Sequence, residues 1–316
     1  MDRIPSVDLS DFLSGKPELK QKFIDEIGLA YEEIGFVALK GHFLDESLVE
    51  RLYEQIRKFF TLPVEIKRKY EIPGIAGQRG YVSFGKESAK GKKEGDLKEF
   101  WHFGQYVEND PELENEYPAN VEVRELPEFN KVGKEAYRML EKTAKYVLRA
   151  LAMHLELEET YFDEYIYNGN SILRPIHYPP ILKEPEKAVR AAAHGDINLI
   201  TLLMGAQGRG LQVKNHHGDW LDAIAEPDEL MINVGDMLSR HTNNKLKSTI
   251  HRVVNPPREL WGTSRYSIPF FMHPISRMKL DVLESCIDAE HPKLFTDITA
   301  GEFLNQRLVE LGLIKK

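Results

Sequence analysis

The chain has 316 residues, of which 42% are hydrophobic and 29% are charged, as in an ordinary soluble globular protein. This composition excludes fibrous and disordered classes, and the net charge of −8, from 42 basic and 50 acidic residues, argues against nucleic acid as a partner. A single cysteine, Cys286, excludes an internal disulfide framework and a thiolate metal site.

Two further features concern where the protein acts. The first residues carry no basic stretch followed by an apolar run, so a signal peptide is not expected. The longest uncharged stretch in the apolar centre of the chain, residues 197–208, is much shorter than the ~20 residues that a membrane helix needs. We therefore expect a cytoplasmic protein, a monomer or weak oligomer, that does not bind membranes.

Two amphipathic helices are predicted in the first 70 residues, because apolar residues recur at helical spacing over 23–34 and again over 48–59. Asp45 is a suitable N-cap for the second helix, and Pro63 lies just past its end. The Gly-, Lys- and Glu-rich stretch at 85–95 is too polar to pack and is expected to be a surface loop.

A long helix is predicted after Pro127, and His154 on its apolar stripe is expected to be a core histidine with a local partner. From about residue 168 the chain changes to short β-like runs separated by turn residues, at a spacing typical of an antiparallel sandwich or barrel of the jelly-roll kind. The capping-box pattern Thr299-Ala300-Gly301-Glu302 predicts a final helix. The expected strand regions are 171–178, 191–204, 210–213, 220–224, 230–234, 249–254 and 266–272.

Without a usable cysteine, a transition-metal site must be built from His, Asp and Glu, and two His-x-Asp triplets are candidates. His217-Gly218-Asp219 lies between two strand regions among Asn and Gly residues, which predicts an exposed hairpin turn. His194-Gly195-Asp196 lies in an apolar run, where a carboxylate is costly unless it is paired or bound to a metal. We therefore expect the metal at the first triplet.

His251, on a β-branched run, could complete a set of two histidines and one carboxylate, the facial triad that is diagnostic of non-haem Fe(II) oxygenases. Further along, Arg265 and Ser267 share one face of a predicted strand, where an arginine fork and a hydroxyl could bind a carboxylate. The alternative is a surface arginine on an edge strand.

More motifs follow in order along the chain. They are Ile4-Pro5-Ser6-Val7-Asp8-Leu9, Gly35-Phe36, Phe59-Phe60-Thr61-Leu62-Pro63, Gly80-Tyr81, Asp96-Leu97-Lys98-Glu99, Tyr178-Pro179-Pro180, Gly235-Asp236, Thr242-Asn243 and Lys247-Ser248-Thr249. Together with the triad and Arg265-x-Ser267, they resemble the isopenicillin N synthase-like family of Fe(II)/2-oxoglutarate-dependent oxygenases.

The resemblance implies a mainly β fold with flanking α-helices, whose core is a double-stranded β-helix, or jelly roll. The expected organisation is an N-terminal region at 1–125 with helices packed on the barrel, and a connecting long helix at 126–167. The jelly-roll core would span 168–280, and a C-terminal helical segment 281–316.

The resemblance also implies residue roles. His194, Asp196 and His251 would bind Fe(II), while Arg265 and Ser267 would bind the distal carboxylate of the co-substrate 2-oxoglutarate. Tyr178 would hydrogen-bond to that carboxylate or seal its pocket. Ile176 stands where plant members often have Asn, so one co-substrate contact is expected to be absent.

The implied reaction consumes O2 and 2-oxoglutarate, releases succinate and CO2, and hydroxylates a small organic substrate; desaturation or ring closure would use the same site. Because Asp196 is present, a halogenase is not expected. Two alternatives stay open. One is an oxidase without 2-oxoglutarate, of the isopenicillin N synthase or aminocyclopropane carboxylate oxidase type. The other is a non-enzymatic cupin-like binding protein with a structural metal.

Five residues are candidates for the substrate pocket. Phe271 falls on the same strand face as Arg265 by alternation. Trp101, His102 and Phe103 follow the polar loop, and His241 precedes the distal metal ligand. For each, the alternative is core packing or a local hydrogen bond. We expect a partly apolar substrate that is held by stacking and by neutral hydrogen bonds.

Overall fold

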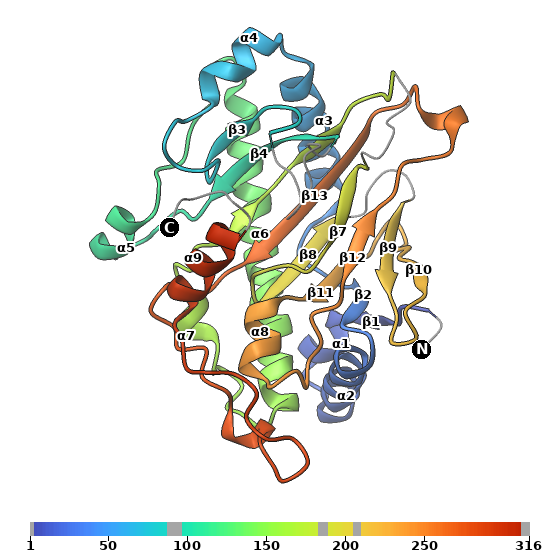
Figure 1. Ribbon diagram of the computed structural model, residues 1–316, viewed down its shortest axis with the longest axis vertical. Coiled ribbons are helices and arrows are strands. Elements are labelled where there is room, and N and C mark those ends of the chain that lie inside the picture. The colour runs from blue at the N-terminus through green and yellow to red at the C-terminus, as the bar shows by residue number, and fades with distance from the viewer. Residues whose placement is uncertain (1–2, 87–96, 183–188, 205–209, 311–316) are drawn as a thin grey trace.

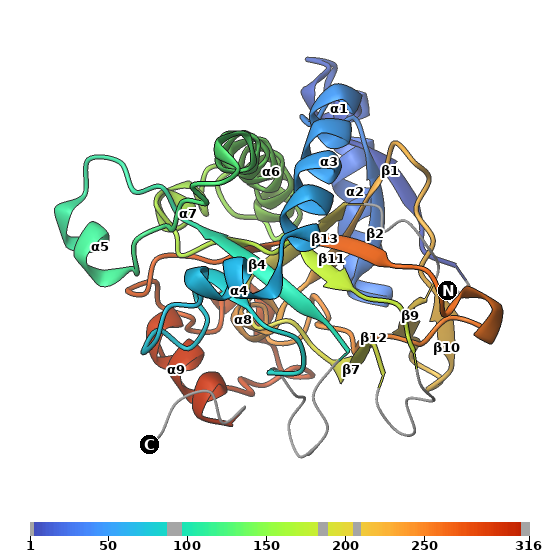
Figure 2. The same cartoon turned by 90° about the horizontal axis from the view of Figure 1, so that it is seen from above.

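A computed structural model describes residues 3–86, 97–182, 189–204 and 210–310 of the chain. Two β-sheets lie face to face, and helices cover the outer face of the larger sheet (Figure 1; Figure 2). The helices are α1 Leu9–Leu13, α2 Pro17–Glu33, α3 Glu46–Thr61, α4 Val64–Lys67, α5 Pro111–Glu116, α6 Pro127–His154, α7 Asp163–Ile166, α8 Asp236–His241 and α9 Ala300–Glu310. The strands are β1 Ser6–Asp8, β2 Phe36–Lys40, β3 Gly80–Val82, β4 Glu99–Gly104, β5 Ile172–Leu173, β6 Ile176–Tyr178, β7 Ala191–His194, β8 Ile200–Met204, β9 Leu211–Lys214, β10 Trp220–Asp222, β11 Leu230–Val234, β12 His251–Val253 and β13 Arg265–Met272.

The major sheet has the strand order β1-β2-β11-β8-β13-β5-β4-β3 within the described residues, with β6 pairing with both β13 and β4. Its central strand β13 is antiparallel to β8 and places Arg265 opposite Tyr178 of β6. The minor sheet has the order β10-β9-β12-β7. These facing antiparallel sheets confirm the expected jelly-roll core.

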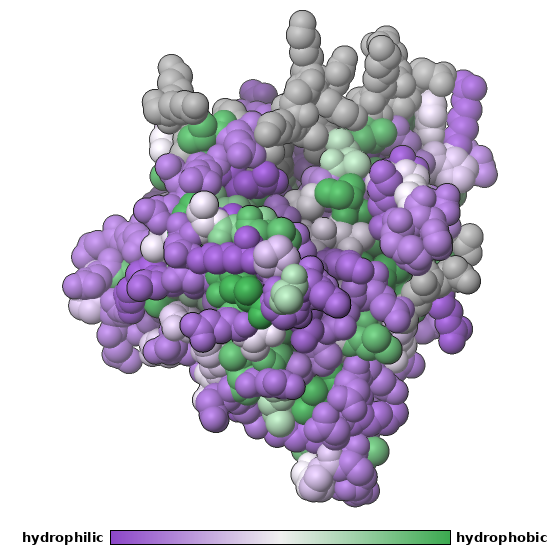
Figure 3. All heavy atoms as spheres, turned by 60° about the horizontal axis from the view of Figure 1, so that its bottom comes forward, coloured by the Kyte–Doolittle hydropathy of each residue, from purple (hydrophilic) through white to green (hydrophobic). Residues whose placement is uncertain are grey.

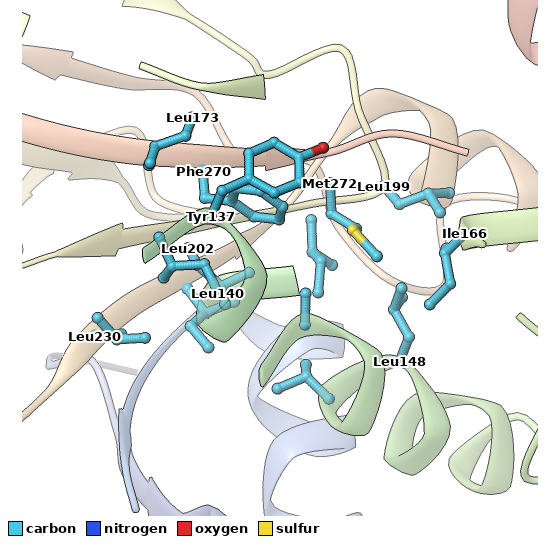
Figure 4. Packing of buried hydrophobic residues seen from close by; sticks show 14 of the residues in the cluster. Tyr137, Leu140, Leu148, Ile166, Leu173, Leu199, Leu202, Leu230, Phe270 and Met272 are labelled. Atoms are coloured by element: carbon cyan, nitrogen blue, oxygen red, sulfur yellow. The ribbon is translucent and has the colours of Figure 1, made fainter. Parts of the chain in front are cut away.

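The main hydrophobic core lies between the major sheet and helix α6. Tyr137 of α6 packs edge-on against Phe270 of β13, with 5.1 Å between the ring centroids, and Leu140 and Leu202 lie beside them (Figure 4). Along β13, Phe270 faces this core, so the alternate residues 265, 267, 269 and 271 face the minor sheet. The alternation of one strand thus separates core residues from candidate site residues.

Several local predictions are confirmed. The two N-terminal amphipathic patterns form α2 and α3, and Asp45 caps α3 by accepting a hydrogen bond from the Leu48 amide. The long helix α6 runs from Pro127 to His154, whose Nε2 lies 2.9 Å from Glu32. At the start of α9, Thr299 and Glu302 form the expected capping box. Most of the expected polar loop at 85–95, namely residues 87–95, lies outside the described residues.

The N-terminal region contributes four strands, β1 to β4, in addition to the expected helices. The apolar strand β2 lies between β1 and β11, so the first 40 residues extend the same sheet that carries the jelly roll. At the other end of this sheet, β3 pairs with β4. On the face shown in Figure 3, hydrophilic residues predominate and hydrophobic residues form separate small patches.

Candidate active site

The three predicted metal ligands come together at one end of the minor sheet. His194 is the last residue of β7, and it pairs in register with His251, the first residue of β12. Asp196 follows two residues after His194, and its Oδ1 lies 3.8 Å from His194 Nε2 and 3.7 Å from His251 Nε2. Ligand atoms of all three residues lie within 4.8 Å of one another, close enough to hold one metal ion.

Hydrogen bonds fix which atoms face the centre of this group. The Nδ1 atoms of His194 and His251 lie 2.7 and 3.2 Å from the backbone oxygens of Ala192 and Thr249, so each ring donates from Nδ1 and presents a free Nε2. Such a partner on the second nitrogen is typical of metal-binding histidines. The donor set therefore fits a divalent first-row transition metal with open coordination positions.

The second oxygen of Asp196 is held separately. Asp196 Oδ2 accepts hydrogen bonds from Thr201 Oγ1 at 2.6 Å and from Asn233 Nδ2 at 2.8 Å. Neither donor was identified from sequence, because Thr201 and Asn233 reach the carboxylate only once β8 and β11 pair beside it. Oδ1 is therefore available to a metal, while Oδ2 is held by hydrogen bonds to strands of the major sheet.

The electrostatics of the group favour the deprotonated states of Asp196 and His194 that can bind a metal. Asp196 is 6% exposed, and burial alone would raise its carboxyl pKa. The adjacent histidines and the two hydrogen bonds outweigh burial and lower this pKa. Desolvation, and then the neighbouring His251, lower the pKa of His194 to about 4, although 44% of this side chain is exposed. At neutral pH the site therefore offers a carboxylate beside an uncharged imidazole, as metal binding requires.

The second triplet occupies a different environment, as predicted. His217 and Asp219 lie in the exposed turn between β9 and β10, where Asn215 accepts hydrogen bonds from both of their backbone amides. Among the described residues, the group around Asp196 is the one cluster of three such side chains with metal-binding proximity.

The predicted co-substrate residues lie between the two sheets. Arg265 is 2% exposed, and within the described part of the chain its Nε and Nη1 atoms have no hydrogen-bond partner. Its guanidinium lies 5.0 Å from the ring centroid of Tyr178, while Ser267 is buried two residues further along β13. A buried cation with unsatisfied donors is costly by itself, so this arrangement fits a carboxylate ligand.

Phe271 and His102 are joined by an arginine that the sequence reasoning missed. The guanidinium of Arg174 lies 5.1 Å from the ring centroid of Phe271, on the face of β13 that carries Arg265. Arg174 Nε donates to His102 Nε2 at 2.5 Å, and His102 Nδ1 donates to the Gly77 carbonyl at 2.7 Å. The bond to Gly77 fixes the His102 ring, and the other ring nitrogen accepts from Arg174 and so orients it.

The other three pocket candidates are packed in the protein core. Trp101 and Phe103 are buried in the helix-side core, where both pack against Phe129 of α6. They alternate with His102 along β4, which turns them away from it. His241 is 3% exposed and hydrogen-bonded to the Tyr161 hydroxyl and to the backbone oxygen of Asp281. These three side chains fill the core, and their place in the substrate pocket stays a prediction.

Both halves of the chain match known protein families. Residues 4–125 match the non-haem dioxygenase in morphine synthesis N-terminal family, and residues 169–274 match the 2OG-Fe(II) oxygenase superfamily. The chain belongs to the 2OG-Fe(II) oxygenase superfamily. This finding supports the main prediction from sequence over the oxidase without 2-oxoglutarate and the non-enzymatic binding protein.

Relatives of this 2OG-Fe(II) oxygenase cover nearly its whole length. The 2-oxoglutarate-Fe(II) type oxidoreductase hxnY of Emericella nidulans is 32% identical over 95% of this chain and 88% of its own. A 2OG-Fe(II) oxygenase family protein of Caulobacter crescentus has a crystal structure with a TM-score of 0.89, with 42% identity over 98% of this chain and 100% of that one. A full-length Neurospora crassa protein, whose crystal structure holds alpha-KG and thymine, has a TM-score of 0.84 and 31% identity over 97% of this chain and 96% of that one.

The 2OG-Fe(II) oxygenase is therefore an enzyme that uses Fe(II), 2-oxoglutarate and O2 to oxidise a small molecule. Among the described residues, no helix combines the length and the apolar character that crossing a bilayer requires.

Proposed function

We propose that this enzyme hydroxylates a small organic substrate at an Fe(II) ion held by His194, Asp196 and His251. The observation that carries the proposal is the convergence of two Nε2 atoms and one carboxylate oxygen, each with its other polar atom tied to the protein. When bound, Fe(II) would couple the decarboxylation of 2-oxoglutarate by O2, to succinate and CO2, with oxidation of the substrate. The protein residues hold the three ligands in place, and the lowered pKa values of His194 and Asp196 keep their ligand atoms unprotonated at neutral pH.

Arg265, Ser267 and Tyr178 are proposed to bind the distal carboxylate of 2-oxoglutarate. Support comes from the burial of Arg265, from its two donor atoms that lack a partner among the described residues, and from the Tyr178 ring beside it. Ile176 pairs in register with Ser267 and offers no side-chain hydrogen bond, which agrees with the loss of one co-substrate contact in this chain.

The substrate is proposed to lie against Phe271, next to the guanidinium of Arg174 that His102 orients. A planar or partly apolar molecule with a hydrogen-bond acceptor would fit this pair of an aromatic ring and a cation. This proposal modifies the expectation of neutral hydrogen bonds alone. Action in the cytoplasm as a monomer or weak oligomer stays an expectation that rests on composition.

The metal assignment is tested by titrating Fe(II) anaerobically into two matched variants, Asp196→Ala and Asp219→Ala. Each removes the carboxylate of one His-Gly-Asp triplet. We expect the Asp196 variant to lose Fe(II) binding and the Asp219 variant to bind like wild type. The reverse result would contradict the proposed site.

Activity is tested by measuring succinate release with O2, Fe(II), 2-oxoglutarate and a panel of small molecules. Thymine belongs in that panel because the related Neurospora crassa protein was solved with it. We expect one or more compounds to raise succinate release above the rate without substrate, and to gain one oxygen atom by mass spectrometry. Substrate turnover at full rate without any 2-oxo acid would contradict the proposal.

A further inference from the structure

A second arginine lies buried beside the proposed co-substrate residues. Arg190 directly precedes β7, is 3% exposed, and has no partner among the described residues for its Nε atom. The hydrogen bond that it does form there is long, from Nη2 to the backbone oxygen of Thr263 at 3.5 Å. A guanidinium that is desolvated and so weakly satisfied is costly unless a ligand completes its contacts.

Arg190 and Arg265 approach the same aromatic ring from different sheets. Their guanidinium carbons lie 5.7 and 5.0 Å from the centroid of the Tyr178 ring. Burial, and then the positive charge of Arg265, lower the pKa of Arg190 to about 10, so Arg190 remains a cation at neutral pH. In the ranges that the structure describes, no Asp or Glu forms an ion pair with either arginine.

Two buried cations beside one aromatic ring could together bind an anion, and within the described residues no acidic side chain balances their charge. A carboxylate has lone pairs for about four hydrogen bonds, and a bidentate arginine uses two of them. The remaining positions can accept donors from a second guanidinium. Arg190 directly precedes β7 and His194 is its last residue, so this segment supplies one residue toward the anion site and one toward the metal site.

We propose that Arg190 is a second ligand of the distal carboxylate of 2-oxoglutarate, which lies between Arg190 and Arg265. The pair selects dicarboxylic over monocarboxylic 2-oxo acids. This inference rests on the proposed role of Arg265 and adds a residue that the expected Arg-x-Ser pair does not include.

Binding of two co-substrate analogues to the Mn(II)-loaded protein tests the proposal, because Mn(II) occupies the metal site without turnover. The ligands are 2-oxoglutarate and 2-oxopentanoate, which has the same chain length and a methyl group in place of the distal carboxylate. Dissociation constants are measured by calorimetry for wild type, Arg190→Met, Arg265→Met and Arg252→Met. Arg252 is the matched control, since it lies on the neighbouring strand but bonds to Gln212 and stacks on Trp220.

Arg190→Met should weaken 2-oxoglutarate binding by about tenfold or more, and should leave 2-oxopentanoate binding within about twofold of wild type. Arg265→Met should do the same, and Arg252→Met should change neither. Without ligand, Arg190→Met should unfold at a temperature equal to or above that of wild type, because it removes a buried cation next to another one.

The possible failures can be told apart. If Arg265→Met loses the preference for the dicarboxylate and Arg190→Met keeps it, the second ligand is refuted while the role of Arg265 stands. If both variants keep the preference, the proposed co-substrate site also fails. If Arg190→Met weakens both ligands equally and lowers the unfolding temperature, Arg190 serves the fold through Thr263, and the proposal is overturned.

Discussion

The carboxylate of Asp196 depends on residues that do not belong to the proposed metal-binding set. Its Oδ2 atom is satisfied by Thr201 and Asn233 from two strands of the major sheet, while its Oδ1 atom faces the two histidines of the minor sheet. The carboxylate therefore links the two sheets at the site. Removing a hydrogen-bond partner of a metal ligand commonly costs about 10- to 100-fold in affinity.

Asn233→Leu keeps the approximate side-chain volume but removes the amide donor to Asp196. We expect this variant to bind Fe(II) or Mn(II) roughly 10- to 100-fold more weakly than wild type, as measured by anaerobic titration. Asn115→Leu is the control, because Asn115 lies on the exposed helix α5 and bonds to a backbone oxygen of its own helix. Equal affinity of the Asn233 variant and wild type would show that the carboxylate needs no second partner.

A second buried carboxylate, Glu99 of β4, stabilises the folded protein when it is ionised. It accepts hydrogen bonds from Lys67 Nζ at 2.8 Å, from His177 Nδ1 at 2.7 Å and from the Tyr81 hydroxyl. Burial alone would raise the pKa of Glu99, but these three donors outweigh burial and lower it below its usual value of 4.5. Glu99 thus stabilises the fold above pH 4.5, and this contribution is lost as the pH falls through the lowered value.

We expect the free energy of unfolding to fall between about pH 4.5 and lower pH, and Glu99→Gln to flatten this part of the profile. Lys67→Met should cost about 3–5 kcal/mol at about pH 7, because it leaves Glu99 buried without its cation. The control Lys293→Met removes an exposed ion pair with Asp297 and should change stability by less than about 1 kcal/mol. Urea denaturation at several pH values measures all three effects.

At the scale of elements, prediction succeeded for the long amphipathic helices and failed for the N-terminal strands. Helices α2, α3 and α6 carry several turns of apolar periodicity and were predicted. All four N-terminal strands were missed. The strands β1 and β3 have three residues each, too few to establish an alternation, and the longer strands β2 and β4 are buried along nearly their whole length and show no alternation. The expected strand at 191–204 is divided into β7 and β8, because Asp196 leaves the sheet to face the histidines.

Gly35 connects α2 to β2 under two constraints at once. Its φ is +71°, and a Cβ atom there would lie 2.0 Å from the backbone oxygen of Lys247. Gly15 has nearly the same φ, +72°, but open space around it. Gly15→Ala should therefore cost only the left-handed strain of about 1–2 kcal/mol.

Gly35→Ala should cost at least about 1 kcal/mol more than Gly15→Ala, because the backbone of residue 247 must also move. Chemical denaturation of both variants isolates the effect of the close approach. Equal losses of stability in the two variants would mean that the backbone around Lys247 can move away from the new methyl group without a loss of free energy.

At the scale of the molecule, the sequence alone pointed to the two histidines and the aspartate of the metal site and to Arg265, but not to Arg190 or Arg174. His194, Asp196 and His251 stand in short motifs whose spacing carries meaning. Arg190 and Arg174 stand in no such motif, and a lone arginine is usually a surface residue. Their positions result from two sheets facing each other across long stretches of chain, which local patterns do not record.

One sheet contains strands from both family-matching segments, residues 4–125 and 169–274, so we expect that the second segment cannot fold without the first. Residues 126–316 alone would expose the edge of β11 and the faces of α6 that pack on α2 and α3. We expect this fragment to lack the near-ultraviolet circular dichroism of a packed core. The control lacks residues 300–316, of which Ala300 is the one fully buried residue in the described part, and should retain that signal. A folded 126–316 fragment would contradict this view.

The position of β2 between β1 and β11 sets the order of events during synthesis on the ribosome. Residues 36–39 pair with residues 230–233, which are translated almost two hundred codons later. At roughly 5–20 residues per second, the apolar edge of β2 waits roughly 10–40 seconds for its partner. Nascent chains therefore pass through a stage in which an unpaired hydrophobic strand is available to other chains. Slower elongation between these segments would favour aggregation. A chaperone that covers strand edges would oppose it.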